Sequence, residues 1–251
     1  MESMPSWMRQ LDDEGYALLP AVFAKDAPAL ADELDRVLCE RAGEASIRSE
    51  DGTIYAARNL VELWPAARTL WRRPALLDAL TVVLGLRFGL VRTLFFDKPP
   101  GQTWALPWHK DLTIAVRDNR LPSAYFTHPT RKAGVPHVEA PLAVLEAMLT
   151  VRIHLDEATE ANGALQVIPS SHGTGKGLTL DSAPPRLVPA ARGDVLLMRP
   201  LLAHCSGKSH PETTGHRRII HLEFAATPEL ADGYAWHDFL PGLPREPALR
   251  A

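Results

Sequence analysis

The 22 prolines of this chain are spread along its whole length instead of being gathered in a linker. Proline fixes its own φ and lacks a backbone N–H, so each one tends to interrupt a helix or a strand and to favour a turn. This spacing divides the chain into many short segments. It favours a β-rich fold with frequent turns and argues against a bundle of long helices.

The first third of the chain follows a helical pattern. Asp26 is an expected helix N-cap, and the apolar face that follows it ends at Gly43. A second helix is expected over residues 74–84, and a short strand over residues 15–20. We therefore predict an N-terminal helical segment covering about residues 1–85.

From Arg87 onward the apolar residues follow the two-residue period of β-strands. The predicted strands cover residues 86–98, 104–116, 148–156, 164–169, 186–189, 194–199, 201–206 and 217–225. That many strands suit a small two-sheet barrel or jelly roll. Residues 117–140 and 170–184 lack the pattern, and loops of that length often cover a functional site. The simplest prediction is a single domain over residues 1–251, with helices first and a β-barrel after them.

Charge and cysteine content exclude several classes of protein. The net charge is −3 with both signs interspersed, so no basic face predicts nucleic-acid binding. The two cysteines cannot form a disulfide framework, and no apolar run approaches the length that crosses a bilayer. The segment at residues 1–11 lacks the apolar stretch of a signal peptide. We expect a cytoplasmic protein that binds neither nucleic acid nor membrane; no oligomeric state follows from these features.

Two kinds of metal ligand stand two residues apart in the segment PWHKD (107–111). Residues i and i+2 of a strand share a face, so His109 and Asp111 are predicted to bind one metal together. His204, at the end of a strand that follows a Gly-Asp turn, is the predicted third ligand. Two histidines and a carboxylate leave open coordination positions, which suits iron(II) oxygen chemistry. His-x-Asp alone is a common surface pattern, and its order and spacing relative to His204 give it weight.

A cosubstrate on such a metal needs a group that holds its far end. The distal carboxylate of 2-oxoglutarate suits a guanidinium, and Arg217 lies on the strand that follows His204. Ser206 faces the same way as His204 and is a second predicted cosubstrate ligand. Arg217 and Arg218 are adjacent and face opposite ways on a strand, so only one enters the barrel. The flanking pattern favours Arg217 and leaves Arg218 as the alternative.

The chain resembles the phytanoyl-CoA dioxygenase family in several motifs taken together. The matching stretches are DKPPG (97–101), WHKD (108–111), NGALQVIPSSH (162–172), the segment from GD (193–194) to HCSG (204–207), and RRII (217–220). The resemblance covers roughly residues 10–226. It implies a cupin-like double-stranded β-helix, mainly β with flanking helices, and iron(II), 2-oxoglutarate and dioxygen as reactants. It also implies a dioxygenase that hydroxylates a small-molecule metabolite, with succinate and carbon dioxide as coproducts.

Two features of the resemblance refine this expectation. The turn between His204 and the arginine strand is about two residues longer than is common in the family, which bears on the choice between Arg217 and Arg218. Asp111 stands where halogenating relatives carry a small residue, which favours hydroxylation over halogenation. Desaturation or another oxidative outcome stays open, as does the identity of the substrate.

Other polar residues are candidates for the pocket. In the strand 148–156, Arg152 and His154 share a polar face that is either solvated or lines the barrel interior. We assign Arg152 to the cosubstrate or to an anionic substrate, and His154 to the substrate. Lys132 and His137, in the segment 117–140, are further predicted substrate contacts. Lys98 and Gln102 precede the His-x-Asp segment within reach of either site, and His221 and Glu223 predict a hydrogen-bonded pair.

Two other functions remain open at the level of sequence. One is a cupin-like metalloenzyme that does not use 2-oxoglutarate, in which Arg217 has no role. The other is a non-catalytic barrel that binds a small molecule. Fold alone favours none of the three.

Overall fold

The computed structural model describes residues 4–101 and 103–243, and Gln102 lies outside this range. In the described part of the chain, the helices are α1 (Ser6–Glu14), α2 (Ala27–Glu40), α3 (Leu60–Leu63), α4 (Pro74–Leu84) and α5 (Leu142–Glu146), with short 3-10 turns η1 (Pro65–Arg68) and η2 (Ser171–Thr174). None of these helices is long and apolar enough to cross a membrane.

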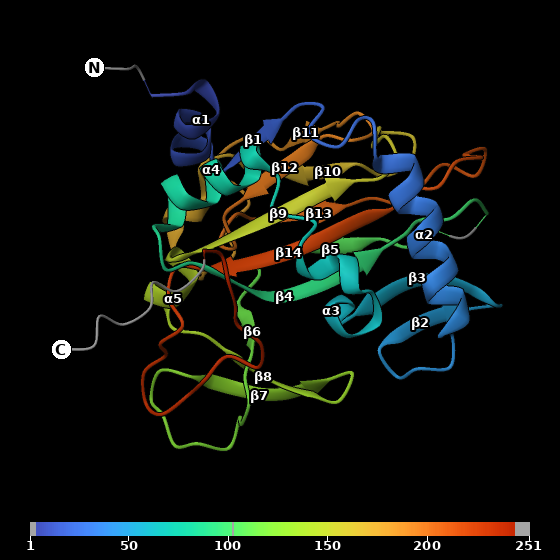
Figure 1. Ribbon diagram of the computed structural model, residues 1–251. Helices are drawn as coiled ribbons and strands as arrows, with labels where there is room; N and C mark the ends of the chain where they lie inside the picture. Colours follow the sequence, from blue (N-terminus) through green and yellow to red (C-terminus); the bar gives the residue numbers. More distant parts are fainter. Residues whose placement is uncertain (1–3, 102, 244–251) are drawn as a thin grey trace.

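The strands form one large sheet and two smaller ones (Figure 1). The large sheet has the order β1 (Tyr16–Leu19), β12 (Val195–Met198), β9 (Met148–His154), β14 (Ile219–Ala225), β4 (Gly89–Phe96), β3 (Thr53–Arg58) and β2 (Ile47–Glu50), with β15 (Leu240–Pro241) also beside β4. The second sheet has the order β11 (Arg186–Val188), β10 (Leu165–Val167), β13 (His204–Ser206) and β5 (Leu106–His109). The third has the order β6 (Thr113–Ala115), β8 (Val135–Glu139) and β7 (Thr127–Lys132).

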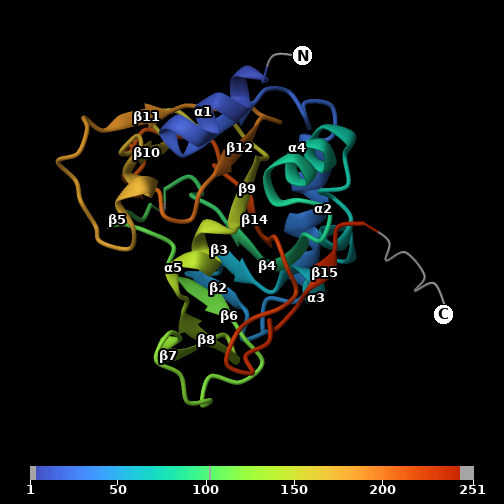
Figure 2. The ribbon, with the colours of Figure 1, turned by 90° about the vertical axis from the view of Figure 1, so that its left-hand side faces the viewer.

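The molecule is layered, with α2, α3 and α4 on one face of the large sheet and the second sheet on the other (Figure 2). On β9 and β14 the apolar residues alternate with polar ones, and Val151, Ile153, Leu222 and Phe224 join the core beneath the helices. A smaller apolar cluster, which includes Leu196 and Val167, packs the large sheet against the second sheet. This mainly β arrangement with flanking helices is the fold class that the sequence predicted.

The polar residues of β9 and β14 face the interior between the sheets. The antiparallel register sets Arg152 opposite His221 and His154 opposite Ile219. Arg152, His154 and His221 are all buried. The solvated alternative for the polar face of 148–156 is therefore wrong, because the second sheet covers it.

Three predictions of secondary structure need correction. The predicted helical segment 1–85 contains the hairpin β2–β3. Its turn is Asp51-Gly52, both with positive φ, which is a common two-residue hairpin turn. The strands are short and mostly exposed or half-buried, so they carry little apolar alternation.

The predicted strand 104–116 is two strands in different sheets. β5 ends at His109 and β6 begins at Thr113, and the chain crosses between sheets over the residues in between. Asp111 therefore follows a strand and does not lie on it. The apolar pattern runs through the break because both strands contain apolar residues, although those of β5 are exposed or half-buried.

The predicted loop 117–140 contains the hairpin β7–β8. Its turn includes Ala133 and Gly134, both with positive φ. β7 is largely exposed, so apolar alternation did not reveal it. The other predicted strands are present and mostly shorter: 86–98 contains β4, 201–206 contains β13, and 217–225 contains β14, which begins at Ile219.

Candidate active site

His109 and His204 come from neighbouring strands of the second sheet. β13 and β5 pair antiparallel, with His204 opposite His109, and their ring centroids lie 4.1 Å apart. The chain separation of these residues is large, so the sheet register is what brings the two imidazoles together. Asp111 is fixed beside them because its backbone N–H donates to the Pro200 carbonyl at 2.9 Å.

Backbone carbonyls set the orientation of both rings. His109 Nδ1 lies 2.7 Å from the Pro107 carbonyl oxygen, and His204 Nδ1 lies 2.9 Å from that of Leu202. A carbonyl can only accept, so each Nδ1 carries the proton and donates it. Each Nε2 then has a free lone pair, which is the form in which a neutral histidine binds a metal.

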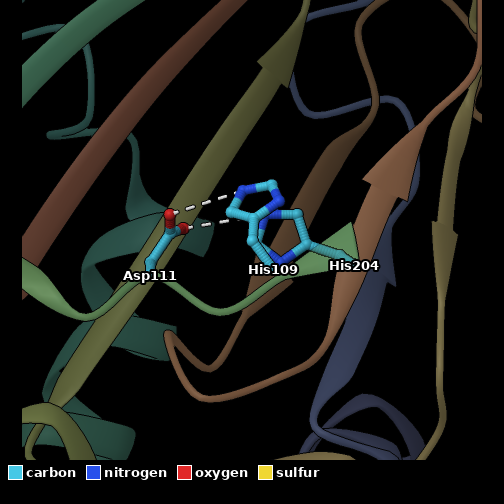
Figure 3. A group of neighbouring side chains, drawn as sticks. All are labelled: His109, Asp111 and His204. Carbon is cyan, nitrogen blue, oxygen red and sulfur yellow. Dashed lines mark ion pairs between the residues drawn. The ribbon is translucent and has the colours of Figure 1, made fainter. Parts of the chain in front are cut away.

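The Asp111 carboxylate lies across from both Nε2 atoms (Figure 3). Its Oδ1 is 3.8 Å from His109 Nε2 and its Oδ2 is 3.8 Å from His204 Nε2. These separations are too long for hydrogen bonds, and Oδ2 is buried without a hydrogen-bond partner among the described residues. The three ligand atoms lie within 4.8 Å of one another, a group that can hold a metal ion.

The protonation states suit a cation. Burial alone would raise the pKa of Asp111, but the positive charges of His204, His221, His109 and Arg92 lower it to about 2. Burial lowers the pKa of His204 to about 4, although Asp111 opposes this shift. At neutral pH the site therefore offers a carboxylate and a neutral imidazole, both ready to bind a metal.

One side of the group is open. The His204 side chain is 2% exposed, whereas those of His109 and Asp111 are 28% and 20% exposed. Two histidines and one carboxylate with an accessible side form the ligand set of non-haem iron(II) oxygenases. A further group of possible ligands, Glu62, His237 and Asp238, lies at the surface with Glu62 exposed.

A group of buried cations lies in the same interior. Arg217 is 1% exposed, and its Nε and Nη1 have no hydrogen-bond partner within the described ranges. Arg152 is 7% exposed, and its Nε also lacks such a partner. Lys98 is 1% exposed and donates to Ser206 Oγ at 3.0 Å and to the Gly207 carbonyl. Buried guanidinium nitrogens without partners indicate a site for an anion.

Burial and mutual repulsion lower the pKa values of these cations. Burial lowers the pKa of Lys98 to about 7, and the nearby charges of Arg217 and Arg152 add to the effect. Burial and the charge of Arg152 lower the pKa of Arg217 to about 9. The interior therefore holds more positive charge than its own carboxylates balance, which favours a bound dianion.

The structure separates the two adjacent arginines. Arg218 binds Asp156 through Nε and Nη2, at 2.8 and 2.9 Å, and Asp35 through Nη1 at 2.6 Å. Its donors are thus occupied on the helix side of the sheet. Arg217 instead lies buried beside Lys98, with which it exchanges backbone hydrogen bonds of 3.2 and 3.3 Å. Of the two, Arg217 is the one available to an interior ligand.

The predicted substrate residues fall into two places. Burial lowers the pKa of His154 to about 3, and the charges of Arg152 and Arg217 add to the effect. His154 therefore lies near the buried cations described above. His137 is buried on β8, with Nδ1 bound to the Val135 carbonyl and Nε2 unpartnered among the described residues. Lys132, on β7, donates to Thr113 Oγ1 at 2.9 Å. Lys132 and His137 thus belong to the third sheet, and His154 does not share their location.

The structure also adds residues to those predicted. His221 Nε2 lies 3.1 Å from Glu223 Oε1, which confirms the predicted pair. Arg92 was not predicted, and it forms an ion pair with the same Glu223 while donating to the Thr113 carbonyl at 3.0 Å. The pairing of Glu223 with Arg92 across β14 and β4 depends on strand register, which the sequence does not show.

Among known protein families, residues 11–220 match the one described as phytanoyl-CoA dioxygenase. No curated protein sequence matches the chain.

Several solved structures share the fold. EctD from S. alaskensis with bound Fe is 20% identical with a TM-score of 0.67, and the match covers 88% of this chain and 76% of that one. AviO1 from Streptomyces viridochromogenes Tue57 is 23% identical with a TM-score of 0.61, and the match covers 88% and 93%. EvdMO1 is 24% identical with a TM-score of 0.63, and the match covers 88% of this chain but only 49% of that one. The non-heme alpha ketoglutarate dependent carbocyclase SnoK from nogalamycin biosynthesis is 16% identical with a TM-score of 0.63 over 92% and 89%. At these identities the likeness establishes a shared cupin-like jelly-roll fold.

Proposed function

The chain belongs to the phytanoyl-CoA dioxygenase family, whose members depend on iron(II) and 2-oxoglutarate, and we propose that this member hydroxylates a small-molecule metabolite. The observation that carries the proposal is that two sites share one interior. A two-histidine, one-carboxylate group with an open side lies beside buried guanidinium groups that have no partner among the described residues. A metal ligand set alone would not explain the second feature.

The proposed iron ligands are His109 Nε2, His204 Nε2 and one oxygen of Asp111. The unpartnered Asp111 Oδ2 and the two Nδ1–H groups held by carbonyls fit this role. When bound, iron and 2-oxoglutarate supply the oxidising chemistry, with dioxygen as oxidant and with succinate and carbon dioxide released. The residues of this chain orient the ligands and exclude water.

The proposed cosubstrate ligands are Arg217, Ser206 and Arg152, and the geometry adds Lys98. Arg217 can offer two parallel N–H donors to the distal carboxylate. Lys98 holds Ser206 Oγ at 3.0 Å, so the hydroxyl is oriented to donate its own proton elsewhere. Substrate would approach from the side on which His109 and Asp111 are partly exposed, with Lys132 and His137 on the neighbouring sheet.

The first experiment is an anaerobic titration of the iron(II)-loaded protein with 2-oxoglutarate, followed by visible absorption. We expect a metal-to-ligand charge-transfer band in the wild type and none in Asp111→Ala. Asp118→Ala is the matched control, because Asp118 pairs only with Arg120 among the described residues and should leave the band unchanged. Iron binding without a band would instead support a cupin-like enzyme that does not use 2-oxoglutarate.

A second measurement tests the reaction type. In a screen of candidate metabolites under labelled dioxygen, hydroxylation places one labelled atom in succinate and one in the product. Label in succinate alone, with an oxidised but unlabelled product, would contradict hydroxylation and indicate desaturation or ring closure.

A further inference from the structure

A cavity of about 260 Å³ lies between the edge of the large sheet and the β7–β8 hairpin. Three of its lining residues are cationic (Arg48, Arg58 and Lys132) and three are aromatic (Tyr55, Phe96 and Trp104). They come from β2, β3, β4, β7 and the segment after β4, so the cavity exists only because those parts of the chain meet. Its volume lies near the lower end of the range for small-ligand pockets.

The cavity adjoins the candidate metal centre. Lys132 Nζ donates to Thr113 Oγ1 at 2.9 Å, and Thr113 stands two residues after Asp111. On the other wall, the Phe96 ring meets the His221 ring edge-on, with centroids 6.0 Å apart. His221 lies on β14, on the face of the large sheet that is turned toward the second sheet, which carries both candidate histidine ligands. The cavity therefore adjoins elements that surround the candidate metal ligands.

The cations of the cavity have no ion-pair partner of their own among the described residues. Neither Arg58 nor Lys132 forms an ion pair there; Glu223, whose charge acts on both, is bound by Arg92 and His221, and the charge of Asp111 also acts on Lys132. Burial lowers the pKa of Lys132, and the charges of Arg92 and Arg58 lower it further. Burial likewise lowers the pKa of Arg58, with Arg92 as the next cause. Like charges gathered without a partner are stabilised by a bound anion.

The aromatic wall is held in place. The Trp104 Nε1–H donates to the Asp97 carbonyl at 2.7 Å, and the ring lies 6.0 Å from that of Phe96, centroid to centroid. With its only polar atom occupied, Trp104 lines the cavity with apolar ring atoms, and Lys98 Nζ lies over the ring, 5.1 Å from its centroid. The cavity thus joins an apolar wall to a cationic end, and these suit the two ends of an amphipathic anion.

We propose that this cavity binds the oxyanion of the substrate, a carboxylate or a phosphate, through Arg58 and Lys132, with an apolar ring or chain against Phe96 and Trp104. The substrate of the proposed oxygenase is then a small organic acid or phosphate ester. That the bound anion is the substrate rests on the proposed function, whereas anion binding by the cavity does not. Neutral molecules of the same shape lack the group that the cations would bind.

The test is calorimetric titration of metal-free protein, without 2-oxoglutarate, using benzoate, phenyl phosphate and the neutral benzyl alcohol as probes. We expect at least one anion to bind about tenfold more tightly than benzyl alcohol, since a charge-assisted hydrogen bond contributes that much or more. Comparison of benzoate with phenyl phosphate separates a carboxylate site from a phosphate site. Arg58→Gln and Lys132→Gln should each weaken anion binding about tenfold.

Two control variants locate the binding. Arg131→Gln removes an exposed cation next in sequence to Lys132 and outside the cavity lining, and it should leave binding unchanged. Arg217→Gln removes the interior cation proposed for the cosubstrate; it should abolish any probe binding at that second site and leave unchanged the binding that Arg58→Gln weakens. Unfolding temperatures confirm that each variant is folded.

Three outcomes would overturn the inference: anion binding that Arg217→Gln abolishes and Arg58→Gln does not, equal affinity for benzyl alcohol and the anions, or no binding of either anion at the highest soluble concentration. Because the titration contains neither iron nor 2-oxoglutarate, its failure is distinct from failure of the charge-transfer experiment. A protein that shows the band but binds no anionic probe remains an oxygenase with a neutral substrate.

Discussion

At the residue scale, Arg217 and Arg218 are adjacent in the chain but have different surroundings. Arg218 is saturated by Asp156 and Asp35, whereas Arg217 is buried with two nitrogens unpartnered in the described part of the chain. The sequence could favour Arg217 only through its flanking pattern. Side-chain direction on opposite faces of the chain is what separates a structural role from a binding role.

We expect Arg217→Ala to weaken 2-oxoglutarate binding about 10- to 100-fold, because it removes charge-assisted hydrogen bonds to the distal carboxylate. Arg218→Ala is the matched comparison. It should leave cosubstrate affinity unchanged and lower the free energy of unfolding by about 1–3 kcal/mol, because Asp156 loses two charge-assisted hydrogen bonds and keeps the backbone N–H of residue 218 and the ion pair with Arg192. Anaerobic titration and chemical denaturation measure the two effects. A loss of affinity in Arg218→Ala alone would reverse the assignment.

We expect Lys98 to make cosubstrate binding dependent on pH. Burial and the neighbouring arginines hold its pKa at about 7 in the folded protein, so at pH 8 it is largely neutral. A bound dianion favours the charged form, and we expect 2-oxoglutarate to bind with uptake of up to about one proton at pH 8. Calorimetry in two buffers of different ionisation enthalpy measures the uptake. Lys98→Met should abolish it; the same uptake in that variant would exclude Lys98 as its source.

The stability of the cosubstrate-free protein should also depend on the protonation of Lys98. Between pH 7 and about 10.4, the pKa of a lysine in the unfolded chain, Lys98 carries its proton in the unfolded chain and has lost it in the folded one. The free energy of unfolding therefore rises with pH across this window because of Lys98. Denaturation at pH 7 and pH 9 should show a smaller rise in Lys98→Met than in the wild type.

At the scale of elements, apolar alternation predicted the central strands and missed the peripheral ones. β9 and β14 bury both faces, and their apolar residues fall on the helix side with regular spacing. β2, β3 and β7 are short or largely exposed, so their side chains carry no such signal. Arg58 lies on β3, so it could not be predicted as a pocket residue from apolar alternation. His109, Asp111 and His204 could be predicted as a group from residue type and spacing, and the structure brings their ligand atoms within 4.8 Å of one another.

The turn before β10 packs closely against residues of the proposed cosubstrate site. Gly163 has a φ of +70°, and a Cβ there would meet the Gly207 carbonyl oxygen and Lys98 Nζ. We expect Gly163→Ala to lower the free energy of unfolding by about 1–3 kcal/mol and to weaken 2-oxoglutarate binding by displacing Lys98. Gly177→Ala is the control, since a Cβ there meets nothing within 4 Å and its φ is unstrained. Unchanged cosubstrate affinity in folded Gly163→Ala would show that Lys98 tolerates the displacement.

At the scale of the whole molecule, stability and chemistry lie on opposite faces of one sheet. The helix side of β14 carries Phe224, whose ring packs edge-on against those of Trp71 and Phe88, with centroids 5.3 and 6.1 Å away. The other side of the same strand carries His221 and Glu223. The single-domain organisation expected from the sequence is consistent with this shared sheet and stays a prediction.

This division predicts that the core can be weakened without altering the site. Phe224→Ala should lower the free energy of unfolding by about 3–5 kcal/mol, because it leaves a cavity beside the two remaining aromatic rings, Trp71 and Phe88. Val82→Ala is the control on α4, where Val82 is 55% exposed, and it should change stability little. Thermal unfolding measures both. At a temperature where Phe224→Ala is folded, its 2-oxoglutarate affinity should equal that of the wild type; a large loss would show that the faces are coupled.

The placement of the proposed iron ligands has a consequence for the life of the protein in a cell. His109 ends one strand, His204 begins its neighbour, and Asp111 lies where the chain leaves for the third sheet. An ion bound by all three would act as a removable cross-link, closing a loop of nearly a hundred residues. Without iron, the protein would unfold locally more often where β5 and β13 meet, and proteases would cleave it there. Iron supply would then govern the abundance of the enzyme as well as its activity.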